Sequence, residues 1–248
     1  MIDIHTHILP GIDDGARNLD VSFALIEEEI RQGIKGIVLT PHFYPEKESF
    51  EHFLEKRTRA LKQLADALDA HPVDVGFRYA AEVHFSPKIL DLDLDLLCIN
   101  GTKYILIEYP MSHLPSTGKD VLYELSSRGY YPILVHAERY PIENKSNYYT
   151  ELVDAGVLIQ INMESVLPGN YRQKKVLEMI RHNLVHLWGS DTHSMDKRPP
   201  RYTECREFLD RKFGPEFLEK CKKNAETVLK GQYVFCEDPI PFKTGLFG

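Results

Sequence analysis

The sequence predicts an α/β fold, a distorted seven-stranded (β/α)7 barrel of TIM-like type with additional C-terminal helices. Short apolar segments rich in β-branched residues alternate with helical segments along the chain. Most of the segments between the strands are long enough to hold a helix, as the connection between parallel strands requires. The strands are almost continuously apolar, which indicates a sheet covered on both faces. A closed or nearly closed barrel follows.

Seven segments have the composition of buried strands. They are apolar, rich in β-branched and aromatic residues, and bounded by turn-forming or helical sequence. In chain order they cover residues 2–5, 36–40, 76–82, 103–108, 131–136, 157–162 and 185–190.

Helices are expected between most of these strands and after the last one. Gly33, Gly129 and Gly156 stand where three of them should stop. The helical segments between strands are 20–32, 49–69, 119–128, 147–154 and 172–182. A loop rich in Pro and Arg follows residue 190, and two further helices are expected at 202–213 and 215–230. The tail, residues 231–248, is expected to be extended, and its role stays open.

Length and composition favour one domain over residues 1–248, because α/β barrels of about this size commonly form a single unit. The apolar runs are strand-sized, so no transmembrane segment is expected. The first residues lack the features of an export signal, which favours a cytoplasmic location. The formal net charge of -7, without a basic stripe, argues against nucleic acid as a partner.

The cysteines are expected to be reduced thiols, since Cys98, Cys205, Cys221 and Cys236 include no C-x-x-C pair. Cys205 and Arg211 match the C-x5-R spacing of cysteine phosphatases. The five residues between them contain no glycine and follow the pattern of an amphipathic helix. That chemistry needs a loop of free backbone amides and a thiol of low pKa, so a cysteine nucleophile is rejected.

Histidines and carboxylates stand at or just beyond the ends of nearly all the predicted strands. The carboxyl ends of parallel strands meet at one rim of a barrel, so ligands distant in sequence become neighbours in space. Imidazole and carboxylate without thiolate suit Mn²⁺, Fe²⁺ or Zn²⁺. The candidate metal ligands are His5, His7, Asp14, His42, Glu82, Glu108, His136, Asp191 and His193.

The spacing of these residues indicates more than one ion. His5 and His7 are two residues apart, so on a strand both imidazoles point to the same side and can reach one ion. Asp191 and His193 repeat this spacing after the last strand. Any one histidine alone is more often a surface or capping residue. The joint placement carries the prediction.

The charge of such a centre would attract an anion. Three divalent cations set against four carboxylates leave roughly two positive charges at the rim. Arg139 and Arg198 fall in rim loops, where guanidinium groups would match phosphate oxygens. His84 and Asn162 are candidates for orienting the ligands from behind. His186 is out of phase with the last ligand pair and is expected to face the helical layer.

A known family has motifs of this kind. The motifs are His5-Thr6-His7, Asp13-Asp14-Gly15, Thr40-Pro41-His42, Glu82, Glu108, His136-Ala137-Glu138-Arg139-Tyr140, Ser190-Asp191-Thr192-His193 and Arg198-Pro199-Pro200. They resemble the polymerase and histidinol phosphatase (PHP) superfamily, and within it the manganese-dependent bacterial tyrosine phosphatases of capsule and exopolysaccharide systems. The likeness extends from residue 1 to about residue 229. Thr6 departs from the serine that is common between the two histidines.

The resemblance implies a three-metal centre with Mn²⁺ as cofactor, where iron or zinc would accept the same ligands. One ion would be held by His5, His7, Glu82 and Asp191, a second by Glu82, Glu108 and His136, and a third by Asp14, His42 and His193. Arg139 and Arg198 would bind the phosphate. The implied substrate is a phosphotyrosine protein, a membrane-associated bacterial tyrosine kinase that controls capsular or exopolysaccharide synthesis.

The mechanistic hypothesis is attack on phosphorus by a hydroxide that bridges two metals, in line with the departing tyrosine oxygen. A phenol has a pKa of about 10, so the need for a general acid is weak. Two alternatives remain open at this point. One is a PHP phosphoesterase that acts on a small metabolite such as histidinol phosphate. The other is a weakly catalytic regulatory subunit that binds the kinase.

Overall fold

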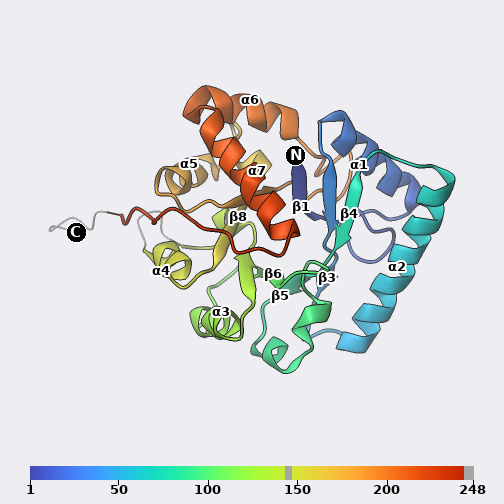
Figure 1. Cartoon of the computed structure of the whole chain (residues 1–248), viewed down its shortest axis with the longest axis horizontal. Coiled ribbons are helices and arrows are strands. Elements are labelled where there is room, and N and C mark those ends of the chain that lie inside the picture. Colours follow the sequence, from blue (N-terminus) through green and yellow to red (C-terminus); the bar gives the residue numbers. More distant parts are fainter. Residues whose placement is uncertain (143–146, 243–248) are drawn as a thin grey trace.

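A computed structural model describes residues 1–142 and 147–242 of the chain. Every pairing between its strands is parallel. The strands are β1 (Ile2–Thr6), β2 (Gly36–Leu39), β3 (His42–Phe43), β4 (Gly76–Tyr79), β5 (Glu82–His84), β6 (Tyr104–Glu108), β7 (Tyr131–Leu134), β8 (Leu158–Asn162) and β9 (Leu187–Gly189). Together they form a curled sheet with helices around it, which confirms the predicted fold class (Figure 1).

The predicted strand 76–82 is interrupted, and a short strand that the sequence did not predict follows the predicted strand 36–40. Pro41, which has no backbone N–H to donate, separates β2 from β3. Ala80 and Ala81 separate β4 from β5. The neighbouring segments stay aligned across both gaps, because the amide of Ala80 donates to the carbonyl of Leu39 at 2.9 Å and the amide of Glu82 donates to that of Pro41 at 3.0 Å. β3 therefore extends the path of the predicted strand 36–40, and β5 extends that of the predicted strand 76–82.

The last strand is joined to the first just beyond the end of β9. The amide of Asp191 donates to the carbonyl of His5 at 2.9 Å, and the amide of His7 donates to that of Thr192 at 3.0 Å. These bonds connect the six-stranded sheet β3-β5-β6-β7-β8-β9 to the three-stranded sheet β1-β2-β4. The result is a distorted barrel.

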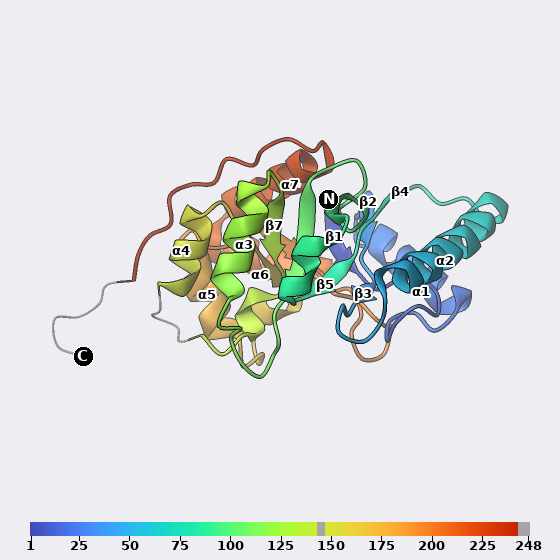
Figure 2. The ribbon, with the colours of Figure 1, turned by 90° about the horizontal axis from the view of Figure 1, so that it is seen from below.

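The helices surround this barrel. In the described part of the chain they are α1 (Leu19–Arg31), α2 (Phe50–Ala70), α3 (Gly118–Ser127), α4 (Tyr148–Asp154), α5 (Gln173–Arg181), α6 (Tyr202–Phe213) and α7 (Pro215–Leu229). Figure 2 places α1 and α2 on one flank and α3, α4 and α5 on the other. The sequence did not predict four short 3-10 helices, at Pro87–Asp91, Leu94–Leu96, Ala137–Arg139 and Met163–Val166.

Local chemistry explains where two of the helices begin. The side chain of Asn18 accepts from the amide of Val21 at 3.1 Å at the start of α1, and the hydroxyl of Ser49 accepts from the amide of His52 at 3.2 Å at the start of α2. Both satisfy amides that have no partner within the helix. Gly33 ends the first helical unit with φ of 90°, a conformation that only glycine adopts readily.

The barrel interior changes from apolar to polar along the strands. Ile4, Leu106 and Leu158 are buried in one cluster with Ala225 and Val228 of α7. That cluster precedes the inward polar side chains near the strand ends, so α7 covers the side where the strands begin. The predicted ligands therefore lie at the opposite mouth.

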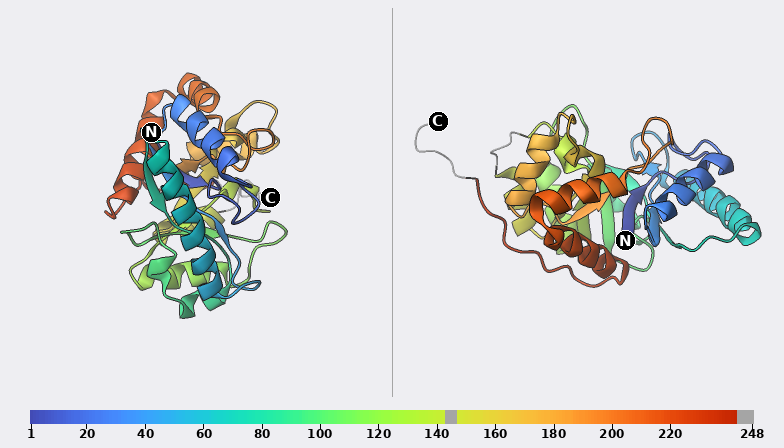
Figure 3. Two further views of the ribbon diagram at one scale, coloured as in Figure 1. Left: turned by 90° about the vertical axis from the view of Figure 1, so that its right-hand side faces the viewer. Right: turned by 90° about the horizontal axis from the view of Figure 1, so that it is seen from above.

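The tail follows α7 along the outside of the barrel, drawn in dark red in Figure 3. Residues 232–242 form neither helix nor strand. The hydroxyl of Tyr104 donates to the carbonyl of Gln232 at 2.7 Å and accepts from the amide of Val234 at 3.1 Å, and the amide of Ile240 donates to the carbonyl of His182 at 2.9 Å. The remainder of the predicted tail, 243–248, lies outside the described residues.

Two further sequence predictions concern membranes and cysteines. Among the described residues, no helix combines the length and apolarity needed to cross a bilayer.

Cys205 is buried within α6, and burial raises the pKa of its thiol. The C-x5-R match is therefore a helical segment, as the sequence analysis concluded.

Candidate metal centre

All nine predicted ligands gather at the carboxyl-terminal mouth of the barrel. Eight are largely buried, whereas Asp14, on the turn after β1, exposes 68% of its side chain. Seven of the nine form three overlapping groups, each compact enough to surround one ion, and His136 and Asp191 lie beside these groups. Two ligands that each lie about 2.1 Å from a common ion stand about 3.0 to 3.4 Å apart at octahedral or tetrahedral angles. This range is the test for each group.

The first group lies around the H-x-H pair. His5 Nε2 and His7 Nε2 are 3.2 Å apart, and Glu82 Oε2 is 3.3 Å from the former and 3.1 Å from the latter. Asp191 Oδ1 is 3.4 Å from His7 Nε2 and 3.8 Å from His5 Nε2. The separations among His5, His7 and Glu82 fall within the range and suit one ion. Asp191 lies within that range of His7 but farther from His5.

The second group lies around the two glutamates. His136 Nε2 is 2.6 Å from Glu82 Oε1 and 3.6 Å from Glu108 Oε1. His42 Nδ1 is 2.8 Å from Glu82 Oε2 and 3.9 Å from Glu108 Oε2. These four separations lie just outside the 3.0 to 3.4 Å range, the two to Glu82 below it and the two to Glu108 above it. The structure also brings His42 to this group, which the resemblance did not imply.

The third group lies nearest the solvent. Asp14 Oδ1 is 3.4 Å from His42 Nε2 and also 3.4 Å from His193 Nε2, and His7 completes the group. Because His42 reaches the second group through Nδ1 and the third through Nε2, its ring stands between them. His42 would bind an ion of the second group through Nδ1 and an ion of the third group through Nε2.

Buried ligand atoms that make no hydrogen bond support the presence of cations here. Glu82 Oε2, Glu108 Oε2 and His193 Nε2 make no hydrogen bond within the described residues. Leaving buried polar atoms unpaired is costly, and a cation among them would remove that cost. Burial, followed by the nearby Glu82 carboxylate, raises the pKa of Glu108 to about 7. Two carboxylates this close need positive charge to remain ionised together, so the residues fit a cluster of divalent ions.

Further side chains fix the ligands from behind. Asp13 Oδ2 is 2.8 Å from His7 Nδ1 and accepts from the amide of His42 at 3.1 Å, while its other oxygen accepts from the amide of Gly15 at 2.9 Å. A Cβ on Gly15 would stand 2.1 Å from the carbonyl oxygen of His7, so only glycine fits there. In the motif Asp13-Asp14-Gly15, Asp13 orients a histidine, Asp14 is a candidate ligand, and Gly15 leaves room for the backbone of His7.

Gln160 is a site residue that the sequence analysis missed. Its Oε1 is 3.2 Å from His5 Nδ1 and accepts from the amide of His136 at 2.9 Å. The sequence does contain an indication of this role. Gln160 is a polar residue in an otherwise apolar strand, two positions before Asn162 and therefore on the same face. The orienting role predicted for Asn162 agrees with the structure, since its side-chain amide donates to Asp191 Oδ2 at 2.6 Å.

Two candidate ligands have unusual backbone conformations. His136 has φ of 33° and Asp191 has φ of 53°, in the left-handed region that non-glycine residues rarely occupy. The Tyr140 hydroxyl lies 3.2 Å from His136 Nδ1 and donates to the carbonyl of Val135 at 2.8 Å. Burial lowers the pKa of His136 to about 4, which keeps the ring neutral and able to bind a metal.

The two predicted arginines meet on one oxygen atom. Arg139 Nη2 is 2.9 Å and Arg198 Nη2 is 2.6 Å from Asp191 Oδ2, while Asp191 Oδ1 faces the histidines. Their side chains are 18% and 31% exposed. They therefore lie at the edge of the cluster, where their remaining N–H donors can reach an anion.

The remaining histidines lie outside the three groups. His182 stacks on Phe242 with ring centroids 3.8 Å apart. His186 Nδ1 accepts from the amide of Ile159 at 3.0 Å, and its carbonyl accepts from Asn224 of α7, so it faces the helical layer as predicted. His84 lies beside the centre without joining any group, and its ring neighbours Tyr44.

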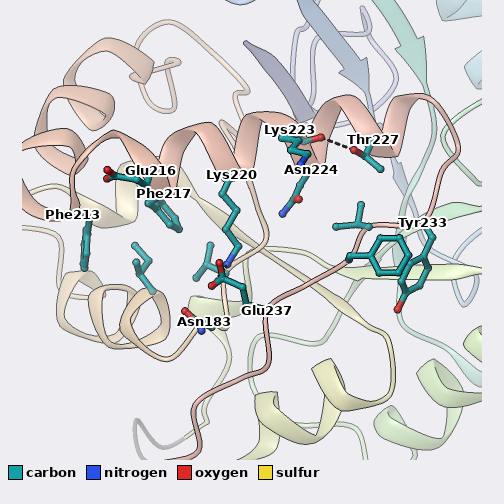
Figure 4. A pocket seen from close by; sticks show the side chains of 14 residues that line it. Asn183, Phe213, Glu216, Phe217, Lys220, Lys223, Asn224, Thr227, Tyr233 and Glu237 are labelled. Atoms are coloured by element: carbon teal, nitrogen blue, oxygen red, sulfur yellow. Dashed lines mark hydrogen bonds and ion pairs between the residues drawn. The ribbon is translucent and has the colours of Figure 1, made fainter.

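A separate groove of about 540 Å³ lies between α5, α7 and the tail. Figure 4 shows Lys220 and Glu237 facing each other there, and their charged groups are 2.9 Å apart. Phe213 and Phe217 supply apolar surface near one end of it. No predicted ligand lines this groove, so it is not part of the centre.

The chain is similar to known proteins over nearly its whole length. The family described as "Capsular polysaccharide synthesis, CpsB/CapC" matches residues 1–230. Tyrosine-protein phosphatase YwqE of Bacillus subtilis is 34% identical over 260 residues, covering 100% of this chain and 99% of the relative. Tyrosine-protein phosphatase CpsB of Streptococcus agalactiae is 34% identical, covering 94% of this chain and 100% of the relative.

A solved structure is similar over almost the whole chain. It comes from work on YwqE from Bacillus subtilis and CpsB from Streptococcus pneumoniae, described as unique metal-dependent tyrosine phosphatases. The match has a TM-score of 0.89 and 32% sequence identity, and it covers 98% of this chain and 100% of the other.

Proposed function

The chain belongs to the CpsB/CapC family of capsular polysaccharide synthesis, and from this premise we propose that it hydrolyses phosphotyrosine in proteins as a metal-dependent phosphatase. The observation that carries the proposal is the meeting of nine candidate ligand side chains and two arginines at one mouth of the barrel. The full-length relatives are named for the same activity, which favours this function over a small-metabolite phosphatase or a regulatory subunit.

We propose three divalent ions, with manganese as the physiological metal and iron or zinc as chemically acceptable substitutes. The holding residues are His5, His7, Glu82 and Asp191 for one ion, Glu82, Glu108 and His136 for another, and Asp14, His42 and His193 for the third. When bound, divalent ions supply an acidified water and neutralise charge on the phosphate. The protein fixes where they sit.

The remaining chemistry belongs to the chain itself. Arg139 and Arg198 would bind the phosphate oxygens with paired N–H donors and stabilise the charge that develops during transfer. Asn162 holds Asp191 Oδ2 at 2.6 Å, so the carboxylate keeps its orientation when the arginines turn toward substrate. A tyrosine phenol has a pKa of about 10, which reduces the need for a proton donor on the leaving oxygen.

The proposed substrate is a phosphotyrosine-bearing protein of the capsule or exopolysaccharide system, specifically a membrane-associated tyrosine kinase. The family description supports the pathway, and the relatives' names support the phosphotyrosine. Phosphate release from a phosphorylated kinase of this type would test the identity of the substrate.

The decisive experiment combines metal analysis with activity. Protein purified without added metal is assayed for bound manganese, iron and zinc, then for release of phosphate from a phosphotyrosine peptide and from histidinol phosphate. We expect metal-dependent turnover of the peptide and little of the metabolite. Preference for the metabolite, or bound metal without turnover of either, would support the corresponding alternative function instead.

A matched pair of variants assigns the activity to this site. His136→Ala should abolish turnover while circular dichroism shows an intact fold. His52→Ala, an exposed residue of α2, serves as the control and should behave as wild type. Wild-type turnover by the His136 variant would refute the proposed centre.

A further inference from the structure

An aromatic pair borders the metal centre one step farther toward the mouth of the barrel. His42 and Glu82 are paired in register between β3 and β5. Side chains two positions apart on a strand share a face. His84 therefore shares a face with Glu82 on β5, and the ring of Tyr44, the residue just after β3, lies next to that of His84. Their ring centroids are 5.2 Å apart with an interplanar angle of 37°.

The Tyr44–His84 pair lies next to the candidate ligands His42 and Glu108. The ring of Tyr44 is 5.2 Å from that of His42, and His84 is level with Glu108 in the pairing of β5 with β6. Tyr44 and His84 are partly exposed, as is His42, whereas Glu82 and Glu108 are buried. The ammonium of the exposed Lys47 lies 4.1 Å from the centroid of the Tyr44 ring. That ring is thus reached from the solvent side by a flexible side chain, which another group can displace.

We propose that Tyr44 and His84 form an aromatic wall that packs against the phenyl ring of the substrate and selects aryl over alkyl phosphate esters. This inference rests on the proposed phosphatase function. The two residues would determine specificity and would not take part in bond breaking. A phosphate held among the cations and arginines would carry its ester group toward solvent, and the partly exposed rings of Tyr44 and His84 offer an aromatic surface beside the centre. Ring-to-ring packing is favourable in tilted and offset arrangements such as the one already seen here.

The prediction distinguishes ligands that differ only in a ring. Inorganic phosphate contacts the centre alone, whereas phenylphosphonate adds a phenyl group. An aromatic contact corresponds to about a 2- to 10-fold change in affinity. In Tyr44→Leu, the inhibition constant of phenylphosphonate and the KM for a phosphotyrosine peptide should both rise by about this factor. The inhibition constant of inorganic phosphate should stay at the wild-type value.

Conservative variants separate packing from a general structural effect. Tyr44→Phe and His84→Phe keep a ring and should retain wild-type preference for the aryl ligand, while His84→Leu should lose it. Tyr123→Leu changes an exposed tyrosine of α3 that belongs to none of the ligand groups, and it should leave both inhibition constants unchanged.

The outcomes are distinguishable from failure of the proposed function. If the wild-type protein with metal bound does not hydrolyse the phosphotyrosine peptide, the proposed function fails. If it does, but Tyr44→Leu weakens phosphate and phenylphosphonate equally or weakens neither, the aromatic wall is wrong.

Discussion

The carboxylate of Asp3 accepts a hydrogen bond from the backbone amide of Ser190, with a separation of 3.2 Å to each oxygen. The same side chain accepts from the amide of His5 at 3.0 Å. One buried residue of the first strand thus holds the end of the last strand beside it. The H-x-H pair and the Asp191-x-His193 pair begin immediately after these two amides, so Asp3 helps to set their relative positions.

Replacing Asp3 should destabilise the protein through these two amides. Asp3→Ala leaves both buried N–H groups without an acceptor, and we expect the free energy of unfolding to fall by about 2 kcal/mol or more. Asp3→Asn retains a carbonyl oxygen and should stay within about 1 kcal/mol of wild type. Urea unfolding measures both. Equal losses in the two variants would show that the negative charge, rather than the acceptor, is what matters.

Gly15→Ala should disrupt the centre without touching a ligand side chain. The added Cβ would stand 2.1 Å from the carbonyl oxygen of His7, which forces the turn and Asp13 away. We expect a loss of about 10- to 100-fold in kcat/KM, together with less bound metal, as for other residues that orient ligands. Gly76→Ala is the control, because its Cβ would meet nothing nearer than 3.7 Å. Normal metal content and activity in Gly15→Ala would contradict the prediction.

Arg198→Ala should weaken catalysis while leaving the bound metal in place. Its guanidinium touches Asp191 through the oxygen turned away from the histidines, so its loss removes a phosphate contact rather than a ligand. A decrease of about 100-fold in kcat/KM is expected from the loss of one such donor. Arg201→Ala removes an exposed arginine paired with Glu204 and should change neither quantity. Unchanged kinetic constants for Arg198→Ala would remove it from the site.

Glu29 should make the protein less stable as pH rises. Burial, followed by the charge of Asp3 and then of Glu28, raises the pKa of Glu29 well above its ordinary value of 4.5. The unfolded chain releases this proton near its ordinary pKa while the folded chain retains it, so the folded state binds more protons above that point. The free energy of unfolding therefore falls from about pH 4.5 upward until the folded group ionises.

Glu29→Gln tests this by removing the titrating group. The decrease in stability between about pH 5 and pH 8 should become smaller in the variant, measured by urea unfolding at both values. Glu27→Gln, an exposed neighbour on the same helix, should keep the wild-type dependence. An identical pH dependence in Glu29→Gln and wild type would rule out the role of this carboxyl group.

Much of the architecture was predictable because it depends on neighbours in sequence. Helix ends follow from capping side chains such as Asn18 and Ser49, and from stops such as Gly33, all of which act within one turn. Strand positions follow from runs of apolar residues that must be buried on both faces. The short strand β3 and the break at Ala80-Ala81 were not predicted, because they depend on how two neighbouring strands bend together.

The sequence by itself determined which side chains stand at the strand ends, since parallel strands place their carboxyl ends at one mouth. Only the tertiary structure decided how these side chains meet. His42 facing two groups, Gln160 reaching both His5 and His136, and the two arginines converging on Asp191 all join segments tens of residues apart. Such contacts are set by the curvature of the barrel and the exact paths of its loops, which local residue preferences do not encode.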